Sequence, residues 1–80
     1  MSIEGSLLQM IELFVSGADT SIANANAIES AIDEHYPDNA VLQETVEMLA
    51  MYRPGGGEYL FDVSQIQRRL IQTSEYLRTL

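Results

Sequence analysis

The sequence contains no cysteine, no tryptophan and no lysine. Without cysteine there can be no disulfide, no thiol nucleophile and no metal centre held by thiolates. No apolar run approaches the ~20 residues that a helix needs to span a bilayer, and the first apolar stretch, LLQMIELFV, is interrupted by Gln9 and Glu12. The N-terminus also lacks the Lys or Arg of a secretory signal. We therefore expect a cytoplasmic protein.

Basic residues are scarce and unevenly placed. Twelve Asp and Glu stand against four Arg, which gives a formal net charge of −8. The arginines are Arg53, Arg68, Arg69 and Arg78, so every residue from 1 to 52 is acidic or uncharged. Nucleic acids and anionic membranes bind clustered Lys and Arg, so we expect neither as a partner. The charge favours a basic protein as the partner instead.

The chain has the length of a single domain, which we expect to span residues 1–80. A protein of this size buries only about 60% of the surface that its unfolded chain exposes, so its core is small. A homodimer would cover more of it, and the segment ANANA, residues 23–27, has small side chains that would allow a second copy or another helix to approach closely. The apolar fraction of 46% is typical of a folded globular protein.

Apolar residues recur at helical spacing in four segments. The first is predicted to begin after an N-cap at Ser6 and to end at Gly17, which has the position of a C-terminal glycine. The second is predicted to begin within 19–21, where Asp, Thr and Ser all offer capping oxygens, and to end before Pro37.

The third segment is predicted to follow Asp38 or Asn39 and to end before Pro54. The fourth has the strongest start signal, with Asp62 as N-cap and Gln65 at the position that completes a capping box. Three of the arginines, Arg68, Arg69 and Arg78, belong to this fourth segment, and we expect them near the negative end of its helix dipole. Short connections favour antiparallel neighbours, so the sequence predicts an all-α fold, a compact up-down bundle of four short helices in two helical hairpins.

The stretch YRPGGGEYLFD, residues 52–62, interrupts the helical periodicity. A phosphate-binding glycine loop normally follows a strand and has a basic residue, whereas these glycines follow a helix and precede Glu58. We therefore predict no cofactor. The glycines favour a chain reversal between two helices, although a short extended segment at 58–61 is compatible with the pattern. The aromatic residues Tyr52, Tyr59 and Phe61 either close the end of the core or anchor a partner.

Like-charged carboxylates are paired along two of the predicted helices. Glu29 and Asp33 have i,i+4 spacing, and Glu44 and Glu47 have i,i+3 spacing. Each such pair costs about 0.2–0.5 kcal/mol in an isolated helix. Either these are solvated faces that maintain solubility, or a basic partner neutralises them and is steered toward them.

The single histidine, His35, follows Asp33 and Glu34 near a predicted helix end. A metal site would need further ligands from other helices, and a general base would need a nucleophile beside it. No ligand-spaced or triad-like cluster accompanies His35 in the sequence, so we expect a partly exposed side chain and predict no metal site and no catalytic residue.

Two segments carry a resemblance to a known family. LFVSG, residues 13–17, and VEMLAMYRPGGGEYLFDVSQIQRRL, residues 46–70, resemble the small bacterial immunity proteins of the colicin D immunity type. The resemblance covers the first helix and the last half of the chain. It implies an acidic helical inhibitor that covers the basic active site of a ribonuclease toxin, with the anionic surface imitating the phosphates of the substrate. It assigns no inhibitory role to any single residue.

The sequence therefore predicts a non-enzymatic protein–protein interaction module that binds a basic protein. An immunity or antitoxin-like inhibitor of a bacterial nuclease is the narrower alternative, and a small metal-binding or enzymatic domain around His35 is the other. The predicted partner-binding residues are Glu29, Asp33, Glu44, Glu47, Tyr52, Tyr59 and Phe61.

Overall fold

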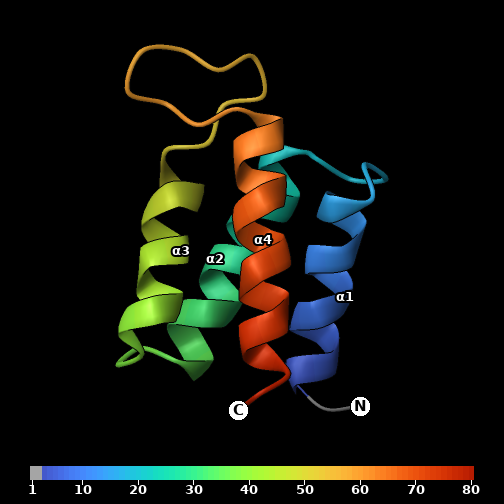
Figure 1. Cartoon of the computed structure of the whole chain (residues 1–80), viewed down its shortest axis with the longest axis vertical. Helices are drawn as coiled ribbons and strands as arrows, with labels where there is room; N and C mark the ends of the chain where they lie inside the picture. The colour runs from blue at the N-terminus through green and yellow to red at the C-terminus, as the bar shows by residue number, and fades with distance from the viewer. Residues whose placement is uncertain (1–2) are drawn as a thin grey trace.

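A ring of four helices forms the protein, and the computed structural model describes residues 3–80. The helices are α1 (Ile3–Val15), α2 (Ile22–His35), α3 (Ala40–Ala50) and α4 (Val63–Leu77). Each helix packs against its neighbour in the sequence, and α1 also packs against α4, which closes the ring. Neighbouring helices run in opposite directions, and α1 begins at the same end of the bundle at which α4 ends (Figure 1). The predicted all-α up-down bundle is confirmed.

Side-chain caps fix where three of the helices begin. Ser21 caps α2 and Asn39 caps α3, each with a side-chain oxygen 3.1 Å from a backbone nitrogen of the first turn. Asp62 and Gln65 form the predicted capping box, because each side chain accepts a hydrogen bond from the other's backbone N–H at 2.9 Å. These predicted starts are confirmed.

The predicted start of α1 is wrong, whereas its predicted end is confirmed. The helix begins at Ile3, three residues before Ser6. A Ser–Gln spacing marks a cap only where the preceding backbone is extended, and here that backbone is already helical. At the other end, Gly17 has a φ of 86°, the left-handed conformation that glycine adopts at low cost after a helix.

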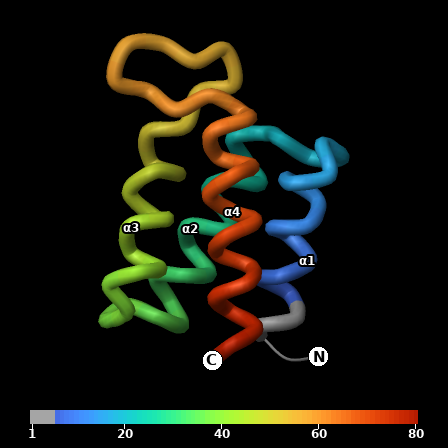
Figure 2. The backbone as a smooth tube through the Cα atoms, in the orientation of Figure 1, coloured from blue at the N-terminus to red at the C-terminus, as the bar shows by residue number. Residues whose placement is uncertain are grey.

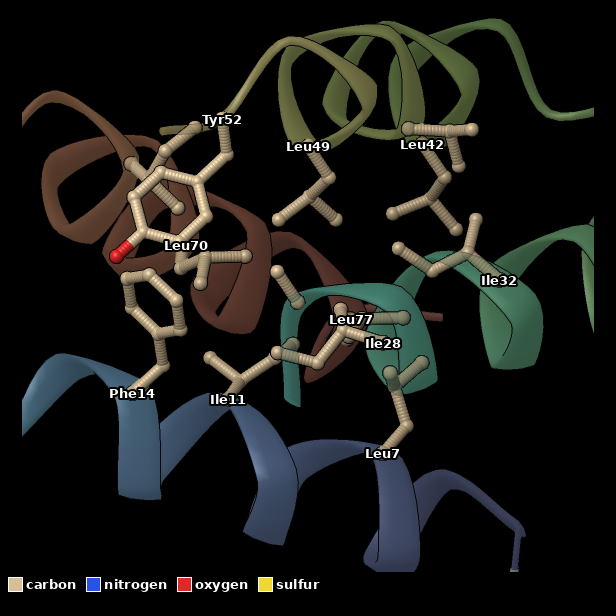
Figure 3. Close-up of a cluster of buried hydrophobic side chains, with 13 residues drawn as sticks. Leu7, Ile11, Phe14, Ile28, Ile32, Leu42, Leu49, Tyr52, Leu70 and Leu77 are labelled. Atoms are coloured by element: carbon tan, nitrogen blue, oxygen red, sulfur yellow. The ribbon is translucent and has the colours of Figure 1, made fainter. Parts of the chain in front are cut away.

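The core lies along the axis of the bundle and receives side chains from all four helices (Figure 3). Its buried apolar members on the helices are Leu7, Ile11, Phe14, Ala25, Ile28, Ile32, Leu42, Val46, Leu49, Ile66, Leu70 and Leu77. These residues recur at intervals of three, four or seven within each helix, which places them on one face of it. The helices are therefore positioned mainly by apolar burial.

Tyr52 closes the end of the core nearest the long connection. It follows α3 and is only 1% exposed. Its ring meets that of Phe14 edge to face, with the centroids 5.2 Å apart (Figure 3). Its hydroxyl donates a hydrogen bond of 2.6 Å to the carbonyl oxygen of Thr20, in the connection between α1 and α2. One side chain therefore joins three segments of the chain.

A polar network crosses the seam between α3 and α4. The Nε of Arg69 donates to the Thr45 hydroxyl at 2.9 Å, and the Thr73 hydroxyl donates to the carbonyl oxygen of Arg69 at 2.8 Å. Since this uses the only proton of Thr73, the 2.9 Å bond between the two threonine hydroxyls must be donated by Thr45. Arg69 thus contacts α3. Arg68 and Arg69 both lie mid-helix, so their predicted role at the negative end of the helix dipole is wrong, and only Arg78, the C-cap, lies there.

Replacing Thr73 with valine should destabilise the protein by about 1–3 kcal/mol, because the buried Thr45 hydroxyl loses its acceptor while the shape of residue 73 is preserved. Urea denaturation measures the change. The matched control is Thr79→Val, which alters an exposed threonine and should leave the free energy of unfolding nearly unchanged. Equal stability of the Thr73→Val variant and the wild type would contradict the network.

The connection between α3 and α4 arches over the ends of these two helices (Figure 2). Its base is closed by two backbone hydrogen bonds, from Arg53 N to Phe61 O at 2.9 Å and from Phe61 N to Met51 O at 3.0 Å. Phe61 pairs with Tyr52 only as an isolated β-bridge, so the extended segment that the sequence allowed at 58–61 is limited to one residue pair. The loop therefore has a defined shape at its base.

Candidate functional site

Two of the predicted acidic residues lie on the side of α2 that faces α3. The opposite side of α2 faces α1, since the Asn24 amide donates to the carbonyl oxygen of Met10 at 3.1 Å. Glu29 is five residues from Asn24, which places it about 140° around the helix, and Asp33 follows one turn later. Within the described chain α2 packs against α1 and α3 only. Glu29 is half-buried at the edge of α2 toward α3, and Asp33 is exposed one turn further along that edge.

A third acidic residue borders the same seam from α3. The Gln43 amide donates to the carbonyl oxygen of Tyr36, at the end of α2, over 3.2 Å. Gln43 therefore lies at the edge of α3 next to α2, and Glu47 is exposed one turn further along the helix from that edge. The two helices are antiparallel, and Glu29 and Glu47 lie at similar distances from the turn at Pro37. We name Glu29, Asp33 and Glu47 the α2–α3 acidic face.

Ion pairs separate the predicted acidic residues into two groups. Arg69 of α4 contacts Glu44, with 3.5 Å between Nη2 and Oε2, so this carboxylate already has a cation from within the chain. The other ion pair in the described residues joins Glu34 to His35 at 3.9 Å, which holds only when the histidine is protonated. No described cation pairs with a member of the α2–α3 acidic face.

Glu29 is held in an environment that opposes its charge. It is half-buried, and burial together with the nearby charge of Asp33 raises the pKa of Glu29 above its ordinary value. The folded state then binds a proton more readily than the unfolded state. Stability therefore falls as the pH rises through the window between the two pKa values, and at neutral pH the ionised Glu29 is a destabilising group.

Glu29→Gln should accordingly stabilise the protein at neutral pH, by about 0.2–0.5 kcal/mol, the cost of a like-charged i,i+4 pair. The gain should vanish well below the pKa of Glu29, where the wild-type carboxyl is also neutral. Melting temperatures of both proteins at neutral and acidic pH test this, with Glu75→Gln on the exposed side of α4 as the control. A gain that persists in acid would show that charge is not its cause.

Charge is also divided across the bundle. Arg68, Arg69 and Arg78 belong to α4 and its C-terminal cap, and Arg53 belongs to the loop above it. In the described structure α4 does not pack against α2, its diagonal neighbour in the ring. In Figure 1 α4 accordingly lies in front of α2. The uneven charge of the sequence becomes an acidic side and a less acidic side of one molecule.

The three predicted aromatic residues are placed differently. Tyr52 is buried, so its assignment as a partner-contacting side chain is corrected: packing against Phe14 leaves no surface for a partner. Phe61 is half-buried and packs against the core. Tyr59 is 83% exposed and lies in the connection between α3 and α4. Of the three, Tyr59 alone presents its ring to solvent.

His35 lies at the C-terminal end of α2 with an exposed surface. Among residues 3–80, no group of three or more His, Asp or Glu side chains could hold a metal ion. Two hollows beside α1, of about 150 and 290 Å³, are smaller than the ~300–1,000 Å³ of typical small-molecule sites. No described helix is long and apolar enough to cross a membrane.

Comparison of the chain with protein-family models, with curated proteins and with solved structures found no match.

Proposed function

We propose that this protein is a non-enzymatic interaction module that binds a basic protein through the α2–α3 acidic face. The observation that carries the proposal is the half-buried Glu29, which lies beside Asp33 and has no cation in contact within the described chain. Such a group costs stability in the isolated protein. A Lys or Arg from a partner would offset that cost by pairing with the Glu29 carboxylate. This pairing stabilises the complex and is absent from the isolated protein.

The rigid helices favour this function. Three carboxylates on two packed helices are held at fixed spacing, so a partner can match them without ordering a flexible segment. The arginines of α4 lie across the bundle from α2, so the molecule is oriented as it approaches a positive surface. Electrostatic attraction of this kind acts mainly on the rate of association and is weakened by salt.

Affinity capture at low and high salt tests the proposal with three tagged proteins. The face variant carries Glu29→Gln, Asp33→Asn and Glu47→Gln. The control variant carries Glu12→Gln, Glu58→Gln and Glu75→Gln, which are exposed positions away from the face. Each removes three negative charges, so both have a net charge of −5 instead of −8. We expect a basic protein to be retained by the wild type and the control at low salt, and lost from the face variant and at high salt.

Two results of this capture would contradict the proposal. Retention of the same basic protein by the face variant would show that the contact lies elsewhere. Equal losses from the face and control variants would show that only the net charge matters, without a defined site.

An inhibitor of a bacterial ribonuclease toxin is the narrower form of the same proposal. It draws on the resemblance of residues 13–17 and 46–70 to immunity proteins of the colicin D type, and on the presence of an acidic face held by rigid helices. If it holds, the captured basic protein cleaves RNA, and adding this chain stops the cleavage in a salt-dependent manner. A captured partner without nuclease activity would leave the broader proposal standing and remove the narrower one.

A further inference from the structure

A hollow of about 150 Å³ lies along the seam between α1 and α4, two helices that run side by side (Figure 1). We name it the α1–α4 hollow. Its apolar lining residues are Leu8, Ile11, Val15 and Ile71. Ile71 is 43% exposed although it lies in the middle of a helix, and Leu8 and Val15 are half-buried. The fold therefore leaves apolar surface uncovered at this seam.

The same hollow is lined by one acidic and one basic side chain, Glu12 of α1 and Arg78, the C-cap of α4. Both are exposed, and neither forms an ion pair within the described chain. The Gln67 amide donates to the carbonyl oxygens of Phe14 and Val15 at 3.2 and 3.3 Å, which fixes how the two antiparallel helices are aligned. The two charges can therefore be placed along the seam.

This alignment puts Glu12 near the level of Ile71, since each lies about one turn beyond the Gln67 contact. Arg78 lies two turns beyond Ile71, which is about 10 Å further along α4. The negative and the positive charge thus occupy different heights of the hollow, with apolar side chains beside them.

A surface of this kind is complementary to a second copy of itself. In an antiparallel pair related by a twofold axis, Glu12 of each copy faces Arg78 of the other, and the apolar linings meet between them. In a parallel pair Glu12 would face Glu12 and Arg78 would face Arg78, which places like charges opposite each other. The charges therefore select the antiparallel arrangement.

The distribution of charge over the bundle favours self-association at this seam. A net charge of −8 makes two copies repel each other, and no Lys or Arg occurs in α1, α2 or α3. Three of the four arginines belong to α4 and its C-cap. The α1–α4 seam also lies across the ring from the α2–α3 seam, so two copies that meet there hold their acidic faces on opposite outer sides.

We infer that the α1–α4 hollow binds a second copy of this chain, in an antiparallel dimer with apolar contact around Ile71 and two reciprocal pairs of Glu12 with Arg78. The hollow is small, so the dimer is weak and exchanges with the monomer. At the low concentrations used for capture of a partner the chain is monomeric, and Glu12→Gln in the acidic-face control variant changes only a charge there.

Sedimentation equilibrium of the full chain, at concentrations up to about 1 mM, measures this dimer. Glu12→Arg and Arg78→Glu should each weaken dimerisation at least about tenfold, because like charges then face each other across the twofold axis. The double reversal exchanges the two charges and keeps the net charge at −8. It should restore the affinity to within about threefold of the wild type, since both opposite pairs form again.

Glu58→Arg and Arg53→Glu are the matched controls. They change the net charge from −8 to −6 and to −10, as the two single reversals at the hollow do, but both positions lie in the connection between α3 and α4. At physiological salt they should dimerise within about threefold of the wild type, because charges far from the interface are screened. Circular dichroism verifies that every variant is folded.

Three results would overturn the inference. The wild type could stay monomeric over the whole concentration range, the single reversals could dimerise as well as their controls, or the double reversal could be as weak as the single ones. None of these results bears on the acidic-face proposal, because no basic partner is present in the experiment.

Discussion

Tyr52→Ala is expected to lower the free energy of unfolding by about 3–5 kcal/mol, the range for removing an aromatic side chain from a core. The ring is 1% exposed and packs against Phe14, so its loss leaves a cavity at the end of the bundle. The hydrogen bond to Thr20 is lost as well. For a domain of this length, each kcal/mol lowers the melting temperature by about 4–8 °C, so this single change should unfold much of the population at moderate temperature.

Tyr52→Phe is the matched control, since it keeps the ring and removes only the hydroxyl. We expect it to cost about 1 kcal/mol, the net worth of one hydrogen bond. Urea denaturation followed by circular dichroism gives both values. If Tyr52→Ala were no less stable than Tyr52→Phe, the ring would not be part of the core, and the connection between α3 and α4 would have to be placed differently.

The second large effect concerns association with the basic partner. Neutralising Glu29, Asp33 and Glu47 together should slow association by about one to two orders of magnitude at low salt, because steering by opposed charges raises association rates by about 10- to 1,000-fold. Dissociation should change less. The control variant at positions 12, 58 and 75 has the same net charge and should associate at nearly the wild-type rate.

Surface plasmon resonance with the captured partner separates the two rate constants. The difference between the face variant and the wild type should shrink as salt is added, because the charges are then screened. A face variant that associates as fast as the control variant would refute a localised site. A change confined to dissociation would indicate a buried polar contact instead of steering.

The helix boundaries that depend on local chemistry were predictable. The caps at Ser21, Asn39 and Asp62 are short-range hydrogen bonds between residues three positions apart, so the sequence contains the whole interaction. The start of α1 was not predictable from Ser6, because a capping pattern inside a helix has the same residues as one at its start. The number of helices and the side of each helix that faces the core could be predicted from the apolar periodicity.

The candidate site was predictable only in part. Paired acidic residues were visible, but Arg69 is 25 positions from Glu44, and their contact depends on how α3 packs against α4. The burial of Tyr52 likewise depends on Phe14 in another helix. Asn24 was missed as a buried residue, although it lies four positions before Ile28 and so belongs to the same stripe of α2. The four-residue spacing between Asn24 and Ile28 could have predicted that Asn24 is buried.

The central claim is tested most directly by a nuclear magnetic resonance titration of the ¹⁵N-labelled chain with the captured basic partner. We predict that the amide signals shifted at low salt will cluster around Glu29, Asp33 and Glu47, on the adjoining surfaces of α2 and α3, and that most of these shifts will disappear at high salt. Shifts centred on α4, or spread evenly over the bundle, would contradict binding through the α2–α3 acidic face.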